Sequence, residues 1–368
     1  MARVSGKLIR WTVFAICFFG TIELACRIEQ WWLDSAAIFG VHTYDTALFT
    51  MDEYGITGKP NGTYEKWRLN AKGFRGPEIQ TEKLDGRLRI VCIGASETFG
   101  LYENPENEWP RQLERHLAGV NADVEVINAA IAGMSLSQRT QHLRQRLLPL
   151  HPDVVVMMLE YGSYAGLTPE KVRVRAANRS VLPDRTGVIE RIKALRAPNR
   201  LKEVVLPRLP RSVQEAVEEL EKGIKLEIRK VELGGNFRLF KHVTALEGDT
   251  FRRDLQELLD TSTAAGVPLV MLSPAMWLSE NNLSRMYLSW PYIDEMWWRE
   301  SRLELVKIAR EFADANHVEF LDLSQIVEGH EDRLMKDMLH FNDDGAAQVA
   351  NQVAHIVLDG RFGLMVHH

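Results

Sequence analysis

Cysteine is scarce in this chain and poorly placed for disulfides or metal. Only three cysteines occur in 368 residues, at Cys17, Cys26 and Cys92. The first two lie in or beside an N-terminal apolar run, which leaves Cys92 alone in the main domain. A disulfide framework is therefore excluded, and no Cys/His spacing predicts a structural zinc site.

An excess of positive charge is also missing. The chain has 45 Lys and Arg against 50 Asp and Glu, a formal net charge of −5. Nucleic-acid-binding proteins normally carry a basic balance or stripe, so this balance argues against that class. Hydrophobic residues make up 45% of the chain and charged residues 26%. These values are ordinary for a folded globular protein and argue against wholesale disorder.

The N-terminal apolar run is short. It is uninterrupted only over residues 11–22, whereas a bilayer-spanning helix needs about 20 residues. Continuing to position 26 lengthens it. Arg3, Lys7 and Arg10 all precede the run, and this placement of positive charge favours a cytoplasmic N-terminus and an exported body.

Four interpretations of this segment are open. The favoured one is an uncleaved signal anchor that tethers the protein to the membrane. A cleaved signal peptide is compatible with the small Ala25 near the end of the run. A lipoprotein is suggested by Leu24-Ala25-Cys26, although Glu23 stands where a lipobox needs an apolar residue. The last alternative is a buried helix of a cytosolic domain.

Strands and helices alternate from residue 87 onward. Short apolar segments predict strands over residues 89–93, 124–128, 154–159, 269–273 and 318–322. Helical patterns are predicted over residues 109–117, 135–148, 250–265, 292–315 and from 343 onward. This alternation predicts an α/β fold with a doubly wound, five-stranded parallel sheet in a flavodoxin-like three-layer sandwich. Ligands bind such sheets outside the carboxyl ends of the strands.

The chain divides into four predicted parts. Residues 1–33 form the signal anchor and membrane-proximal segment, and residues 34–86 an irregular lead-in with turn signals. Residues 87–164 and 248–368 form the α/β domain. Residues 165–247 interrupt it as a charged, mainly helical insertion.

Three polar segments stand where such a fold binds ligands. Ser96 follows the first predicted strand, and on a tight Gly-containing turn it could be a nucleophile or simply a helix N-cap. Gly133 follows the second strand, where it allows close approach of a ligand or merely forms a turn. Asp337 and His340 precede the last helix. They could form an Asp–His pair that faces a serine, or they could belong to a solvated acidic turn.

Taken together, these segments resemble a known family. Gly94-Ala95-Ser96, Gly133 and Asp337-x-x-His340 are similar to the first, second and fifth sequence blocks of the SGNH (GDSL-like) hydrolases. Their order and sheet positions match over residues 87–358, apart from the insertion. Residues 70–76, Asn-Ala-Lys-Gly-Phe-Arg-Gly, also resemble the lead-in of SGNH proteins of the bacterial cell envelope.

The resemblance implies a role for each residue. Ser96 would be the nucleophile, His340 the general base and then acid, and Asp337 its orienting partner. The backbone N–H groups of Ser96 and Gly133 would serve the oxyanion hole. Such a reaction needs no metal and no dissociable cofactor.

The sequence departs from the family pattern at two places. Ala95 stands where the first block usually has Asp, which is not the triad acid. The third block usually places an Asn after the third strand, and the stretch Leu159–Ser163 has none. Tyr161, Ser163 or a backbone N–H could supply the missing donor, whose loss typically costs on the order of 10²–10³ in rate.

Two weaker features lie outside the blocks. Aromatic residues that follow the fourth strand could line a substrate cleft or pack in the core; they are Trp277, Tyr287, Trp290, Tyr292, Trp297 and Trp298. The arginines of the insertion could meet anionic lipid or an acidic polymer, or lie on a solvated helical surface; they are Arg173, Arg175, Arg179, Arg185, Arg191, Arg196 and Arg200.

The expected function is hydrolysis or transfer of an O-acyl group through an acyl-enzyme. The resemblance and the export signal favour an envelope carbohydrate ester, such as an O-acetyl ester, as the substrate. The body would lie outside the cytoplasm, on the periplasmic side of the inner membrane in a Gram-negative cell. A lipase or lysophospholipase at the membrane, and an SGNH-fold binding protein with impaired catalysis, are the alternatives.

Overall fold

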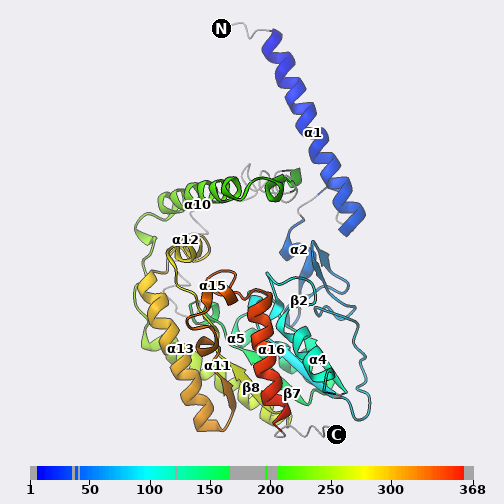
Figure 1. Ribbon diagram of the computed structural model, residues 1–368, viewed down its shortest axis with the longest axis vertical. Coiled ribbons are helices and arrows are strands. Elements are labelled where there is room, and N and C mark those ends of the chain that lie inside the picture. Colours follow the sequence, from blue (N-terminus) through cyan, green and yellow to red (C-terminus); the bar gives the residue numbers. More distant parts are fainter. Residues whose placement is uncertain are drawn as a thin grey trace.

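A five-stranded, all-parallel sheet forms the centre of the molecule in the computed structural model (Figure 1). The structure describes residues 6–34, 38–39, 42–120, 123–165, 195–197, 200 and 205–359. The strands are β5 (Leu88–Ile93), β6 (Val124–Asn128), β7 (Val154–Met158), β8 (Leu269–Leu272) and β9 (Glu319–Leu321). Their spatial order, β6-β5-β7-β8-β9, is that of a flavodoxin-like doubly wound sheet. The predicted fold class is confirmed.

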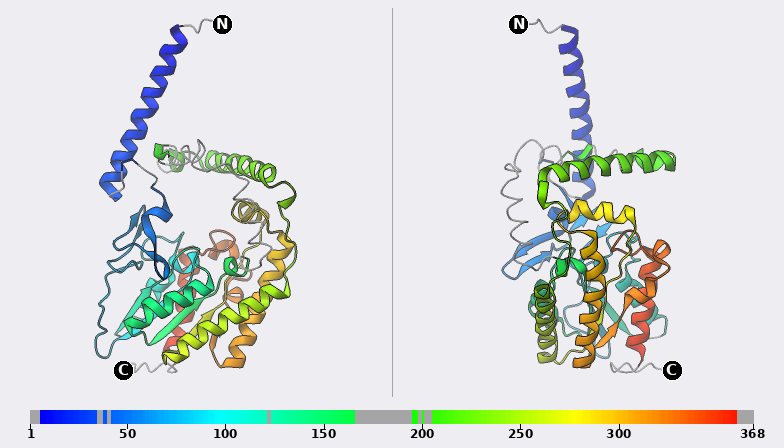
Figure 2. Two further views of the ribbon diagram at one scale, coloured as in Figure 1. Left: turned by 180° about the vertical axis from the view of Figure 1, so that it is seen from behind. Right: turned by 90° about the vertical axis from the view of Figure 1, so that its left-hand side faces the viewer.

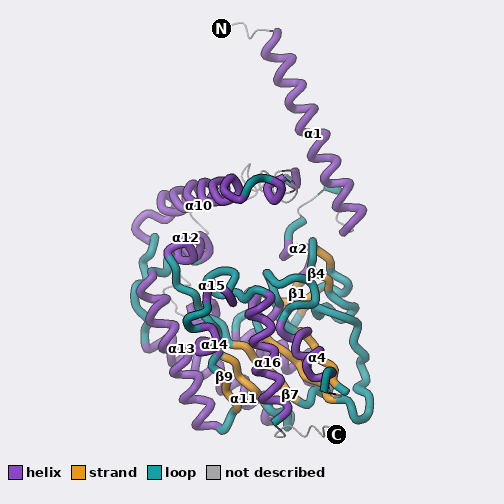
Figure 3. The backbone as a smooth tube through the Cα atoms, viewed as in Figure 1, coloured by secondary structure: helices purple, strands orange, loops and turns teal. Residues whose placement is uncertain are grey.

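Helices cover both faces of the sheet (Figure 3). Successive strand residues point to opposite faces, so Ile90 and Cys92 belong to one core and Val91 and Ile93 to the other. The first core is covered by α4 (Trp109–Ala118) and α16 (Asp343–Leu358). The second is covered by α5 (Leu136–His142), α11 (Ala245–Ala264) and α13 (Glu295–Asn316). Two buried faces explain why the strands are almost entirely apolar.

Two predicted helices differ from the observed ones. The helix expected over residues 135–148 ends as α5 at His142 and continues as a π-helical turn, Leu143–Leu147, and a 3-10 turn, Leu148–Leu150. Pro149 lies in that last turn and lacks the N–H that a regular helix needs there. The helix expected over residues 292–315 begins only at Glu295, and a separate helix, α12 (Glu280–Ser289), precedes it.

The lead-in over residues 34–86 is more regular than predicted. It contains α2 (Tyr44–Leu48), a hairpin of β1 (Phe49–Asp52) and β2 (Gly55–Gly58), and a hairpin of β3 (Thr63–Tyr64) and β4 (Trp67–Arg68). Strands this short show no clear alternation, so the sequence pattern could not reveal them. Apolar side chains of the lead-in form a small core with Phe99 and Met134, next to the predicted site.

Helix α1 (Gly6–Asp34) projects away from the body in every view (Figure 2). Its segment Ile9–Leu33 has 25 residues and a mean hydropathy of 1.5, and none of its most apolar part is buried against the rest of the protein. The segment is therefore long and apolar enough to span a membrane. The helix continues past Glu23, and this makes it longer than the uninterrupted apolar run.

Part of the predicted insertion carries a long helix, α10 (Arg211–Leu233). The predicted arginines Arg173, Arg175, Arg179, Arg185 and Arg191 lie outside the described residues. Arg196 and Arg200 contact α1: the backbone N–H of Arg196 donates to Glu23 over 2.9 Å, and the guanidinium of Arg200 donates to Glu29. The guanidinium of Arg196 donates to the backbone carbonyl of Arg27 over 3.4 Å, so both arginines contact groups of the chain itself.

Candidate active site

Ser96 begins a short helix, α3 (Ser96–Phe99), directly after the end of β5. The turn between strand and helix is tight: a Cβ atom on Gly94 would overlap the side chain of Thr98. Gly100 ends the helix in the left-handed conformation, with φ of 80°. Such a turn places the serine hydroxyl at the carboxyl edge of the sheet, where ligands bind.

The lead-in and β6 hold the other end of α3. The guanidinium of Arg75 donates to the carbonyl oxygens of Phe99 and Gly100 and pairs with Glu108 at 3.3 Å. The side-chain amide of Asn128 donates to the carbonyl oxygen of Thr98 over 3.0 Å. These contacts fix the orientation of the helix that carries Ser96, and give residues 70–76 a structural role.

The structure brings Ser96, His340 and Asp337 together. His340 Nε2 lies 2.8 Å from Ser96 Oγ, and His340 Nδ1 lies 2.8 Å from Asp337 Oδ1. In the tautomer that fits, Nδ1–H donates to Asp337 and Nε2 accepts the serine proton. Asp337 Oδ1 also accepts the backbone N–H groups of Leu339 and His340 at 2.9 Å. This is the geometry of a Ser-His-Asp relay.

The environment tunes both partners of the relay. Burial opposes charge on His340, but the hydrogen bond and charge of Asp337, assisted by Glu97 and Glu103, raise the pKa of the imidazole above its ordinary value. Burial likewise opposes charge on Asp337, yet the hydrogen bonds from His340 and from the Leu339 backbone lower its pKa. A base with a raised pKa holds the serine proton more strongly once it has taken it.

A buried carboxyl group lies behind the nucleophile. Glu97 is 4% exposed, and its Oε2 lies 3.2 Å from Ser96 Oγ. Burial raises the pKa of Glu97; the charge of Glu160 adds to the effect, while His340 and Arg139 oppose it. Sequence analysis missed Glu97, since a glutamate after a strand-end serine carries no pattern of its own.

Arg139 connects the second and third predicted blocks. This fully buried side chain donates to the carbonyl oxygens of Met134 and Met158 and pairs with Glu160 at 3.0 Å. It therefore ties the loop of Gly133 to the end of β7. An arginine on the buried side of a predicted helix is the signal that could have found it.

The predicted oxyanion donors lie on neighbouring segments. The N–H of Ser96 has no partner within α3 because the first N–H groups of a helix never do. Gly133 has a φ of 77°, and a Cβ there would meet nothing within 4 Å, so its backbone borders open space. Tyr161 is fully buried, and its hydroxyl has no hydrogen-bond partner among the residues described. The side chain of Ser163 lies outside the described part.

Tyr102 covers the relay and was not predicted. Its ring lies 5.1 Å from that of His340, edge to face. Burial and the nearby charge of Asp337 raise the pKa of Tyr102 to about 12. The adjacent Glu103 is only 1% exposed, and burial raises its pKa to about 8. Both residues follow α3, so proximity to Ser96 in sequence was the available signal.

The predicted aromatic residues separate into two groups. Trp277 and Trp290 are half-buried; the backbone N–H of Trp277 donates to Met338 in the triad loop, and the Trp290 ring lies beside Gly162. Four others belong to the hydrophobic core, as in the packing alternative: Tyr287, Tyr292, Trp297 and Trp298. Only the first pair borders the candidate site.

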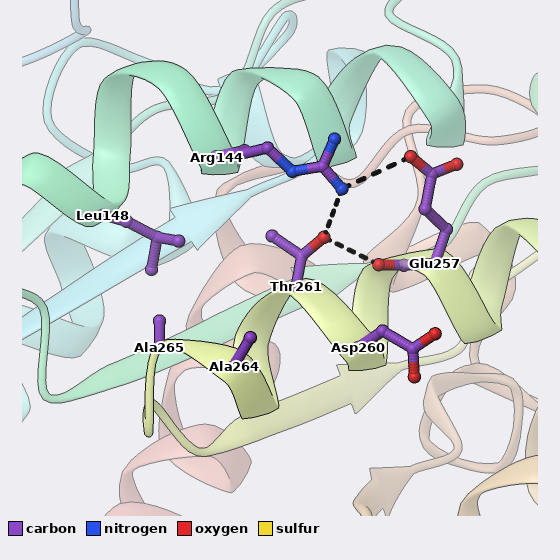
Figure 4. A pocket seen from close by; sticks show the side chains of 7 residues that line it. All are labelled: Arg144, Leu148, Glu257, Asp260, Thr261, Ala264 and Ala265. Carbon is purple, nitrogen blue, oxygen red and sulfur yellow. Dashed lines mark hydrogen bonds and ion pairs between the residues drawn. The ribbon is translucent and has the colours of Figure 1, made fainter.

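Another surface cleft lies away from the relay (Figure 4). It is lined by α11 and the turns after α5, and in it Arg144 donates to Thr261 over 2.8 Å. The one hydroxyl in its lining, that of Thr261, accepts from Arg144 and donates to the backbone carbonyl oxygen of Glu257, so it is engaged on both sides. In the described ranges no group of three or more His, Cys, Asp or Glu residues could hold a metal ion.

Comparison with known proteins identifies the family of the chain. Residues 92–348 match the model of the GDSL-like lipase/acylhydrolase family. No curated protein matches the sequence. A lipase/acylhydrolase from Enterococcus faecalis is 17% identical, with a TM-score of 0.43 over 73% of this chain and 95% of its own. The acetyl xylan esterase AlAXEase is 14% identical, with a TM-score of 0.42 over 74% and 100% of the two chains.

Proposed function

The chain belongs to the GDSL-like lipase/acylhydrolase family, and on that premise we propose that Ser96, His340 and Asp337 are the catalytic triad of an ester-cleaving enzyme. The observation that carries the proposal is the continuous relay, with 2.8 Å from Ser96 to His340 and 2.8 Å from His340 to Asp337.

The first half of the reaction acylates the enzyme. Ser96 Oγ attacks the ester carbonyl carbon while His340 Nε2 takes the serine proton. The carbonyl oxygen becomes an oxyanion, which the N–H groups of Ser96 and Gly133 stabilise, with Tyr161 or Ser163 proposed as the third donor. The intermediate collapses, the C–O bond to the alcohol breaks, and His340 gives its proton to the departing oxygen. Asp337 stabilises the imidazolium throughout.

The second half releases the acyl group. Water or a sugar hydroxyl gives its proton to His340 and attacks the acyl-enzyme carbonyl, and Ser96 leaves with that proton. Water as acceptor makes the protein a hydrolase, and a hydroxyl acceptor makes it an acyltransferase. We propose O-acyl esters of an envelope carbohydrate, O-acetyl esters above all, as the substrate class.

We also propose that α1 is an uncleaved anchor and that the body lies outside the cytoplasm. The length and apolar composition of Ile9–Leu33 support the anchor, and the basic residues before it support the orientation. A reporter that is active only after export, fused behind His368, should be active. Activity confined to a cytoplasmic reporter would contradict the orientation.

The triad is tested by labelling the full chain, in mild detergent, with a serine-reactive fluorophosphonate. Wild type and Ser284→Ala, a control on the surface of α12, should be labelled, and Ser96→Ala should not. Hydrolysis of a short-chain aryl ester should fall by at least about 10³-fold in Ser96→Ala. Equal rates in wild type and Ser96→Ala would contradict the assignment.

The substrate class is tested with a panel of esters. Acetylated oligosaccharides should be deacetylated faster than lysophospholipids, and a preference for lysophospholipids would favour a lipase. If the probe labels nothing and no ester is turned over, the protein is an SGNH-fold binding protein. A Tyr161→Phe variant should lower kcat with little change in KM if its hydroxyl is the third donor.

A further inference from the structure

Helix α10 carries an exposed apolar stripe that none of the described residues covers. Residues three or four apart share one face of a helix, and six large apolar residues follow that spacing: Val213, Val217, Leu220, Ile224, Ile228 and Val231. Leu220 is 66% exposed, Ile224 53% and Val231 83%. A contiguous exposed apolar surface of this kind marks an interaction site.

The opposite face of α10 lies against the body. Leu226, about half a turn of rotation from the stripe, packs on the main hydrophobic core. Glu218 pairs with Arg285 of α12 at 3.4 Å. Because these contacts occupy the inner face, the stripe points away from the body.

The direction in which the stripe points is also the direction of α1. In the three views of Figures 1 and 2, α10 lies across the end of the body from which α1 projects, crosswise to the axis of α1. Contacts of Arg196 with Glu23 and of Arg200 with Glu29 tie the segment before α10 to α1. These contacts bring residues that precede α10 in the chain beside α1.

We propose that α10 lies flat in the surface of the lipid bilayer that α1 crosses, with its stripe among the lipid chains near the headgroups. The proposal rests on the anchor proposed above, because α1 defines the plane of the membrane. An amphipathic helix perpendicular to a spanning helix, with its apolar side outward, has the geometry of an interfacial helix.

The charged residues of α10 indicate how its membrane binding depends on the charge of the lipid headgroups. The helix has six acidic residues, Glu215, Glu218, Glu219, Glu221, Glu227 and Glu232, and five basic ones, Arg211, Lys222, Lys225, Arg229 and Lys230. Since these charges nearly cancel, binding depends on apolar burial rather than on attraction to anionic headgroups. Zwitterionic and anionic bilayers should therefore be contacted equally.

This placement turns the candidate site toward the membrane. The first turn of α16, which directly follows the loop of Asp337 and His340, lies at the end of the body nearest α10, and its last turn lies at the opposite end (Figure 1). Two contacts with the bilayer, α1 and α10, would hold the carboxyl edge of the sheet at a constant height above the surface. Esters presented by membrane-attached molecules would then reach Ser96.

The test uses the full chain in phosphatidylcholine vesicles, with Cys17→Ser and Cys26→Ser to remove reactive thiols outside the core. A polarity-sensitive dye is attached at Leu220→Cys on the stripe or, as the matched control, at Glu219→Cys, an exposed position on the opposite side of the helix. A third site, Phe14→Cys, reports on α1. Quenching by lipids with brominated chains is compared with quenching by aqueous iodide.

We expect brominated lipid to quench dyes at positions 220 and 14, and iodide to quench the dye at position 219. Quenching by lipid at 14 with only iodide quenching at 220 would overturn the interfacial helix and leave the anchor intact. The absence of lipid quenching at 14 would overturn the anchor and this proposal together. A dye at 220 that both quenchers fail to reach, in vesicles and in detergent, would show a protein partner such as a second copy of the chain and overturn the proposal.

A functional arm uses the double variant Leu220→Glu and Ile224→Glu, which places two charges in the stripe, with Glu219→Gln as its control. Both variants should hydrolyse a water-soluble aryl ester at the wild-type rate. Hydrolysis of an acyl ester anchored in vesicles should fall at least about fivefold in the double variant only, because charge in the apolar stripe opposes burial. An unchanged rate on the anchored ester would contradict a role of α10 in presenting the site to the membrane.

Discussion

The carboxyl group of Glu97 lies 3.2 Å from the hydroxyl of Ser96, on a fully buried side of the nucleophile. The same hydroxyl lies 2.8 Å from His340 Nε2. When Glu97 is protonated it can donate to Ser96 Oγ, and the serine proton then points to His340. When Glu97 is ionised it accepts that proton instead and competes with His340.

This competition predicts a loss of activity as the pH rises through the raised pKa of Glu97. Burial and the charge of Glu160 raise the pKa of Glu97, while His340 and Arg139 oppose the rise. The protonated, productive form is present below the raised pKa and disappears above it. In Glu97→Gln the amide is neutral at every pH, so kcat/KM for an aryl ester should no longer fall over the pH range in which Glu97 ionises in the wild type. Identical alkaline limbs in the two proteins would contradict this role.

Asp337 is predicted to set the acid limb of the same profile. The base must be neutral to accept the serine proton, so activity rises with pH through the raised pKa of His340. In Asp337→Asn the interactions that raise this pKa disappear and burial, which lowers it, remains. The acid limb of kcat/KM should move to lower pH, and kcat should fall on the order of 10⁴-fold. Asp344→Asn, an exposed neighbour, should change neither quantity.

Gly133→Ala is predicted to reduce catalysis without a steric clash. The added Cβ meets nothing within 4 Å, but the φ of 77° costs a non-glycine residue about 1–2 kcal/mol. Relaxation of that strain would turn the N–H away from the oxyanion, with a loss on the order of 10²–10³ in kcat. Gly86→Ala is the matched control, because Gly86 has a φ of 80° and equally open space. Thermal unfolding should show a similar loss of stability in both variants, whereas ester hydrolysis should be reduced in Gly133→Ala alone. Backbone strain by itself would then not explain the loss of activity.

Arg75→Ala is predicted to destabilise the turn that carries Ser96. The Arg75–Glu108 pair is 4% and 2% exposed, and removal of one partner leaves a buried carboxylate and two unpaired carbonyl groups. Loss of one member of such a pair costs about 3–5 kcal/mol. Unfolding followed by tryptophan fluorescence should show this loss, with reduced activity. Arg87→Ala removes an ion pair in which Asp123 is 58% exposed and should cost less than about 1 kcal/mol. Equal losses in both variants would refute the support role of Arg75.

The fold and the proximity of Ser96, Asp337 and His340 could be predicted because the signals for them are local. Each strand is a short apolar segment, as in Val154–Met158, and burial on both faces leaves room for few polar residues. Ser96 and His340 are separated by 244 positions. In the α/β pattern, however, Ser96 follows the carboxyl end of a strand and His340 precedes the last helix. A parallel sheet brings all its carboxyl ends to one edge, so placement in the pattern implied proximity in space.

The contacts that tune the site could not be predicted, because they depend on which side chains meet across elements. Nothing adjacent in sequence shows that Arg75 reaches the end of α3 or that Arg139 joins the loops of Gly133 and Glu160. The apolar spacing of α10 was present in the sequence, but its direction depends on the packing of Leu226 and Glu218 against the body.

The amino-acid order by itself determined the α/β pattern, the apolar N-terminal segment and the identity of Ser96, Asp337 and His340. Only the tertiary structure decided that Glu97 lies against the nucleophile, and that the stripe of α10 faces the side from which α1 projects. The periodic spacing of apolar residues and the position of a residue at the end of a strand can be read from residues that are neighbours in the sequence. The pKa of a carboxyl group and the outward face of a helix are decided by burial, which exists only once distant segments have packed together.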